Sequence, residues 1–191
     1  IGSQVGAQLF GLNSGVAYTY LSFDYSVNRW WNLGVAAAGS SKYEGFSKIK
    51  LLRQQTGKYN VPVSIALFSL VNVNTAPDKS ITFAGDRYNY INQLLISRKF
   101  NDKLSLQLMP TVVHFNKVPY GPKNDNEVYS IGLGGKYKMS DNTNLIFEYS
   151  RQLNMYENVM TSTGSILNYQ PDLLSVGVEM NSGGHQFRLF V

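Results

Sequence analysis

Residues 90–116, YINQLLISRKFNDKLSLQLMPTVVHFN, contain the pattern from which the fold is inferred. From Leu104 to Val112 every second residue is apolar, and the residues between them are mostly polar. Successive side chains of a strand point to opposite faces, so this pattern predicts a strand with one apolar face. A turn at 101–103 joins it to a preceding strand, and both are long enough for the about 9–11 residues that cross a bilayer. The stretch therefore predicts a hairpin of an outer-membrane β-barrel.

The composition of the 191-residue chain agrees with this interpretation. Charged residues make up 15%, below the about 25% of soluble proteins, and there are 13 Tyr against 2 Trp. The absence of cysteine excludes a disulfide framework and a thiolate metal site. The net charge of +5 arises from scattered Lys and Arg, which form no basic patch for nucleic acid. We expect no nucleic-acid partner, no cofactor and no metal.

Similar alternating segments occur on both sides of this hairpin. Further strands are predicted at 17–27, 31–40, 46–55, 61–74, 128–139, 144–153, 172–180 and 185–191. The connections alternate between short (28–30, 56–60, 101–103, 140–143, 181–184) and longer (41–45, 75–87, 117–127, 154–171). Short periplasmic turns and long outer loops are typical of outer-membrane barrels. We expect residues 1–191 to form a single all-β domain, an antiparallel up-and-down transmembrane β-barrel in the bacterial outer membrane.

The direction of the strands predicts that the chain holds only part of the barrel. If the short turns are periplasmic, the last predicted strand runs outward, whereas such barrels close with a descending strand and an even strand count. We therefore expect one more strand before Ala17, in part supplied by residues 1–10, and another after Val191. The chain would then contain ten to eleven of about twelve strands.

Five segments carry a resemblance to known sequences: LLRQQTG at 51–57, VPVS at 61–64, LLISRKFNDKLSLQLMPTVVHFN at 94–116, VYSIGLGGKYKMS at 128–140 and LLSVGVEMNSGGHQFRLFV at 173–191. The most specific are the GGHxF turn and the RKFN…LMP…H run. The chain resembles a family of uncharacterised outer-membrane β-barrel proteins from Bacteroidota. The resemblance implies the fold, the compartment and a further strand after Val191. It implies no activity, ligand or catalytic residue.

The polar strand faces predict which side chains line the lumen. By strand phase these are Asp24, Lys48, Lys50, Gln93, Lys99, Gln107, Lys136, Lys138, Glu148, Glu179 and Arg188. In a narrow barrel such opposite charges pair and fill the interior, and in a wider one they line a water channel. Gly183, Gly184 and His185 are predicted to form a periplasmic turn.

His114 is the candidate for chemistry, because it lies near the outer end of its strand, in phase with Leu104 and Leu108. It could supply half of a Ser-His dyad in a lipid-cleaving barrel, but an interfacial polar aromatic is the simpler interpretation. No GxSxG-type nucleophile motif occurs, and His114 and His185 on opposite rims cannot share a metal. We therefore expect that the protein is not an enzyme.

Three functions remain open from the sequence. The favoured hypothesis is a structural or accessory subunit of an outer-membrane assembly, because the interior has mixed charges and no binding motif. The alternative is a passive pore or transporter for small solutes, where inward Lys favours anions. A lipid hydrolase would need a nucleophile beside His114. The expected partners are outer-membrane lipid or lipopolysaccharide and other outer-membrane proteins.

Overall fold

The computed structural model describes residues 20–39, 41–77, 81, 83–118, 124–160 and 166–191. Its main sheet contains β1 (Tyr20–Ser26), β2 (Trp31–Ala38), β3 (Lys42–Leu52), β4 (Ser64–Asn74), β5 (Tyr88–Lys99), β6 (Leu104–Phe115), β7 (Glu127–Lys138), β8 (Thr143–Gln152), β11 (Asp172–Ser182) and β12 (His185–Phe190). Among the described residues, no helix has the length and hydropathy to cross a membrane. The strand start expected at Ala17 and the strand expected within residues 1–10 lie outside the described residues.

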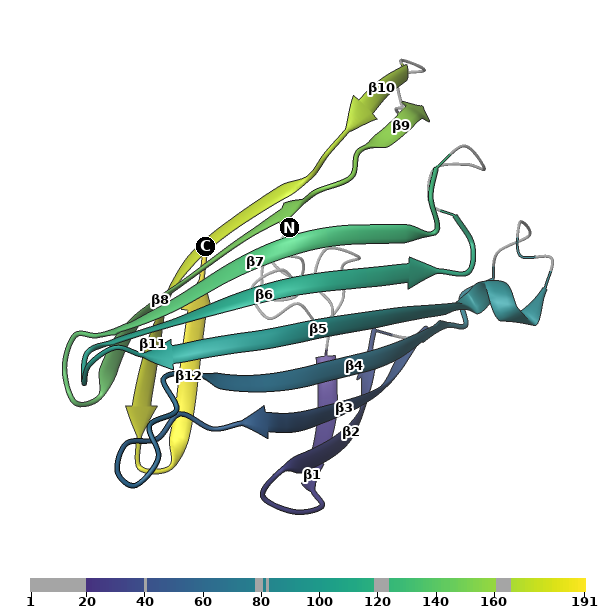
Figure 1. Cartoon of the computed structure of the whole chain (residues 1–191). Helices are drawn as coiled ribbons and strands as arrows, with labels where there is room; N and C mark the ends of the chain where they lie inside the picture. Colours follow the sequence, from purple (N-terminus) through teal and green to yellow (C-terminus); the bar gives the residue numbers. More distant parts are fainter. Residues whose placement is uncertain (1–19, 40, 78–80, 82, 119–123, 161–165) are drawn as a thin grey trace, which may run out of the picture.

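The ten strands follow one another in chain order, and every neighbouring pair is antiparallel. This confirms the predicted all-β, antiparallel up-and-down architecture. β1 and β12 form the two edges of the sheet. Figure 1 shows the tight turns at the left and lower side, and the long connections at the right and upper side. β5, β6 and β7 contain 12 residues each, enough for a tilted bilayer crossing.

The predicted strict alternation of short and long connections is wrong at one place. The β2–β3 connection, residues 39–41, is tight although it lies at the long-loop end, because β3 begins at Lys42 rather than Phe46. The β3–β4 connection spans residues 53–63, and within it a bridge between Gln55 and Val61 closes residues 56–60 into the predicted short turn. β4 begins at Ser64 rather than Val61, since Pro62 has no N–H for a strand ladder.

Two tight turns are closed by asparagine side chains. Asn28 Oδ1 accepts the backbone N–H groups of Trp30 at 2.7 Å and Trp31 at 3.0 Å. Asn101 Oδ1 accepts those of Lys103 and Leu104, both at 2.8 Å. These side-chain bonds replace backbone bonds that a reversing chain cannot make.

The β11–β12 turn uses two glycines instead. Gly183 and Gly184 have φ of 54° and 94°, a conformation that side chains with a Cβ rarely adopt. The predicted GGH turn is therefore a two-residue hairpin loop, and Ser182 pairs directly with His185 across it.

The two faces of the sheet differ in what surrounds them. Asp24 on β1 and Gln107 on β6 line the same cavity although four strands separate them in the sheet. Only the concave face of a curled sheet brings such distant strands together, so this face is the lumen. The opposite face exposes a band of large apolar side chains, including Leu21, Phe23, Leu33, Val35, Leu108, Val112, Ile131, Leu133, Leu145, Leu174, Val176 and Leu189. A patch of that extent needs a membrane or a partner to cover it.

A second hairpin interrupts the long connection after β8, which was predicted as a plain loop. β9 (Tyr156–Met160) and β10 (Ile166–Tyr169) form a separate two-stranded sheet at the long-loop end, seen at the top of Figure 1. Tyr156 and Val159 are buried and pack with Val128, against which Val113 and Phe115 also lie. Val128 and Val113 have lumen-facing strand phase, so the base of the hairpin rests on the rim of the lumen.

Candidate functional site on the lumen wall

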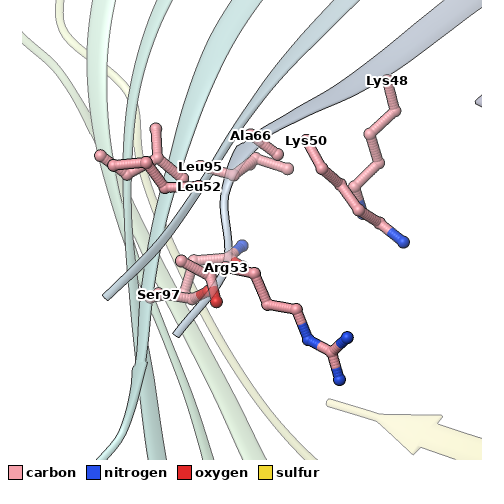
Figure 2. Close-up of a pocket in the computed structure, with 10 residues that line it drawn as sticks. Lys48, Lys50, Leu52, Arg53, Ala66, Leu95 and Ser97 are labelled. Carbon is pink, nitrogen blue, oxygen red and sulfur yellow. The ribbon is translucent and has the colours of Figure 1, made fainter. Parts of the chain in front are cut away.

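Three basic side chains from β3 and the residue after it converge on the lumen. Lys48 and Lys50 both line the lumen cavities, and the β3–β4 register then shifts by one residue between Lys50 and Leu52. Such a β-bulge reverses the facing of the residues that follow. Arg53 therefore comes to the lumen side beside Ser64, and both line a cavity of about 250 Å³ with the two lysines. Figure 2 shows the three cationic groups extending into the same open region.

The position of Arg53 is held by its neighbour Gln54, which acts as a side-chain rung between the strand ends. Its Nε2 donates to the Lys99 carbonyl at 2.8 Å, and its Oε1 accepts the Lys99 N–H at 2.8 Å. Its own backbone N–H donates to Ser64 Oγ at 2.9 Å. The start of the long connection is thus attached to both β4 and the end of β5.

A larger cavity of about 500 Å³ is also lined by both lysines, with Asp24, Gln93 and Gln107. It is mainly polar. Gln93 Nε2 donates to Thr111 Oγ1 at 2.9 Å, whereas the Gln107 side chain has no hydrogen-bond partner among the described residues. Within that part of the chain, no carboxylate forms an ion pair with Lys48, Lys50 or Arg53. Among the described residues on the wall of this cavity, Asp24 is the one acidic side chain, so positive charge is in excess there.

The part of the lumen wall formed by β7, β8, β11 and β12 carries a cluster of paired charges around Glu179 on β11, whose side chain is only 2% exposed. Its Oε1 accepts hydrogen bonds from Lys136 Nζ and, at 2.9 Å, from Asn144 Nδ2. Its Oε2 accepts one from Arg188 Nε at 2.9 Å. The four residues come from β7, β8, β11 and β12, so the cluster links adjacent strands of the wall. Glu148 lies on the same cavity as this cluster.

The remaining predicted lumen residues lie at the tight turns. Lys99 Nζ is 2.8 Å from Asp102 Oδ1, and Lys138 Nζ is 2.7 Å from Asp141 Oδ1. In both turns the hydrogen bond from the lysine lowers the pKa of the aspartate, and the charge of the lysine adds to the effect. These lysines are therefore paired locally, unlike Lys48 and Lys50.

Two residues of the site were missed from the sequence. Strand phase alone places Arg53 on the outer face. The bulge that reverses its direction cannot be recognised from the apolar and polar pattern of residues 51–55, LLRQQ. The contact of Asn144 with Glu179 depends on the β8–β11 register across the inserted hairpin. The only available signal for Arg53 was its closeness to the Lys48–Lys50 pair.

His114 lies outside the lumen, on the outer face near the long-loop end. Its Nδ1 is 2.9 Å from Glu127 Oε1, and its ring centroid is 6.1 Å from that of Tyr90. Nδ1 is the nitrogen that a carboxylate bonds in a Ser-His-Asp triad, but no serine or threonine hydroxyl is bonded to His114 among the described residues. No cluster of three or more potential metal ligands occurs among the described residues.

An antiparallel meander with an apolar outer band and a polar, charged inner wall defines the class of membrane-spanning β-barrels. The family described as "Membrane bound beta barrel domain (DUF5777)" matches residues 1–191, and the chain belongs to this family. A comparison with curated proteins gave no match, and neither did one with solved structures.

Proposed function

We propose that this domain lies in a bacterial outer membrane and that its lumen passes small hydrophilic solutes, with a preference for anions. The compartment is supported by the architecture, because single-chain barrels of this kind are outer-membrane proteins, and by the resemblance to the Bacteroidota family. Cation–aromatic pairs at the tight-turn end also support a membrane interface there. They are Arg29–Trp30, Lys58–Tyr59 and Arg98–Phe100, with the cation 5.1, 5.7 and 5.0 Å from the ring centre.

The observation that carries the transport proposal is the unpaired group Lys48, Lys50 and Arg53. In the Glu179 cluster the cations are paired with a buried carboxylate, whereas Lys50 and Arg53 are exposed and Lys48 is half-buried. Unpaired cations on the wall of these cavities are hydrated by the water of the lumen. Such a wall attracts anions and repels cations along the lumen.

Planar-bilayer recordings of the full-length protein across a KCl gradient test this proposal. We expect steady conductance with a reversal potential that indicates chloride preference. Replacing Lys48, Lys50 and Arg53 together by Met should abolish most of that preference. Lys99→Met is the matched control, because Asp102 already neutralises that lysine, and it should leave the reversal potential nearly unchanged.

If the correctly inserted barrel shows no conductance, the pore proposal is contradicted. That result would favour the second candidate function, an accessory subunit of an outer-membrane assembly. The observation that favours this candidate is the Glu179 cluster, because its opposite charges are paired with one another, as expected for a filled interior. The proposal includes no catalytic step. Unchanged lipid-hydrolase activity in His114→Ala would dispose of the hydrolase hypothesis.

A further inference from the structure

We infer that the Lys48–Lys50–Arg53 cavity is a binding site for the phosphate group of a small solute. This inference deepens the proposed function and rests on it, since the solute must reach the lumen. It goes further than the proposed function because it assigns a discrete site that a solute can saturate. A general preference for anions would not require such a site.

The charge of the site suits a dianion. Three cations line the cavity of about 250 Å³, and a phosphate ester carries about −1.5 to −2 charges at pH 7. A carboxylate, with a single charge, would leave more of the positive charge uncompensated. The guanidinium of Arg53 offers parallel N–H donors that match two oxygens of a phosphate, and the lysines add point charges.

Neutral donors complete the wall of the cavity. Ser64, Ser97 and Gln107 line the same cavity. Ser97 and Gln107 have no side-chain hydrogen bond among the described residues, and Ser64 Oγ accepts the Gln54 N–H, so its own hydroxyl hydrogen is still available to donate. A phosphate has enough acceptor oxygens to use these donors together with the cations.

The site is also held in shape before any ligand binds. The bulge between Lys50 and Leu52 aims Arg53 inward, and Gln54 fixes the adjacent backbone through two bonds to Lys99. A preformed site avoids the entropy loss of ordering a flexible loop on binding. Gln54 is in this sense a positioning residue.

The adjoining cavity determines where the rest of the solute lies. It is lined by Asp24 and Gln93 as well as the two lysines. The carboxylate of Asp24 disfavours a second anionic group there, whereas hydroxyl groups or a cationic group would be accepted. The phosphate therefore lies at the Arg53 end, and the solute we expect is a monophosphate with a neutral or cationic remainder.

Isothermal titration of the detergent-solubilised full chain with inorganic phosphate tests the site without requiring conductance. We expect saturable binding that weakens about tenfold or more in Arg53→Gln and in Lys50→Met, because each change removes a charge-assisted hydrogen bond. Lys138→Met is the matched control, since that lysine is paired with Asp141, and should bind as the wild type. Acetate should bind more weakly than phosphate.

The variant Gln54→Met removes the side-chain hydrogen bonds to Lys99 but retains every charge of the site. It should weaken phosphate binding about tenfold while leaving the chloride preference in bilayers unchanged, a separation that general loss of structure would not produce. Far-ultraviolet circular dichroism checks that each variant is folded.

Equal binding by wild type and Arg53→Gln, no saturable binding, or equal weakening in Lys138→Met would overturn the inference. The two proposals fail separately. Phosphate binding without conductance would support the binding site and refute the proposed pore. Chloride-preferring conductance without phosphate binding would support the pore and refute the binding site.

Discussion

At the residue scale, Glu179 shows how a charge becomes tolerable inside the barrel wall. Its carboxylate accepts bonds from Lys136, Asn144 and Arg188, so its buried oxygens have the partners that burial demands. Removing the carboxylate would leave two cations facing each other. The cost should be moderate, because the side chains of Lys136 and Arg188 are 46% and 54% exposed and water screens them.

We therefore expect Glu179→Leu to lower the free energy of unfolding by about 1–3 kcal/mol. Glu179→Gln keeps the shape and one acceptor and should lose less. Urea unfolding in lipid vesicles, followed by tryptophan fluorescence, measures both variants. Identical midpoints for wild type and Glu179→Leu would show that the cluster does not stabilise the wall.

A second prediction at this scale concerns the pH dependence of the tight turns. The hydrogen bond from Lys138 holds the pKa of Asp141 below its ordinary value of 3.8. A carboxyl with a lowered folded-state pKa contributes stability above its unfolded value, and that contribution is lost as the pH falls through the folded pKa. An NMR titration should show the Asp141 pKa returning toward 3.8 in Lys138→Met. A pKa that does not move would contradict the pairing.

At the scale of elements, the inserted hairpin β9–β10 is the part that departs most from a plain barrel. Tyr156 and Val159 are buried against Val128 at the rim, and Glu157 exchanges two backbone hydrogen bonds with the Asn124 side chain. The hairpin is thus attached to the loop after β6. We expect a hairpin fixed at the rim to narrow the mouth of the lumen at that end.

Replacing residues 156–169 by a short Gly-Ser linker should therefore increase single-channel conductance. The anion preference should stay the same, because Lys48, Lys50 and Arg53 lie near the opposite end of the lumen. Bilayer recordings of the two proteins measure both quantities. Conductance that is unchanged by the deletion would mean that the mouth is not the narrowest part.

At the scale of the whole molecule, the two faces of the sheet meet different environments. On the lipid face an added charge costs about 2–4 kcal/mol near the middle of the membrane, whereas the lumen can solvate it. Two pairs of polar side chains on the outer face are hydrogen-bonded to each other. Ser69 Oγ donates to Asn92 Oδ1 at 2.8 Å, and Trp31 Nε1 donates to Ser47 Oγ at 2.9 Å.

Two adjacent leucines of β5 test this division with the same substitution. Leu94 has the outer phase, and Leu95 lines both lumen cavities beside the lysines. Leu94→Lys should destabilise the barrel in vesicles by about 2–4 kcal/mol, and Leu95→Lys should cost much less. Equal losses in urea unfolding would show that the assignment of the faces is wrong.

Much of the fold followed from local pattern alone. The two-residue period of segments such as 104–112 predicted strand type, antiparallel order and which face is apolar, because alternation is a property of every extended chain. The tight turns at Asn101 and Gly183–Gly184 could also be predicted from the sequence, because their backbone geometry depends on the residues within them. The expected lumen set, including the Lys48–Lys50 pair, rests on the same local rule.

What only the tertiary structure decided is where neighbouring strands meet. The bulge that turns Arg53 inward, the position of Asn144 beside Glu179 and the docking of β9 on Val128 all depend on pairing between segments far apart in the chain. Register is set by the sum of contacts along both strands, so a single strand contains too little information to specify it. For this reason the sequence by itself determined the inside and outside of the barrel, and the tertiary structure determined which inward groups are paired and which are left for a ligand.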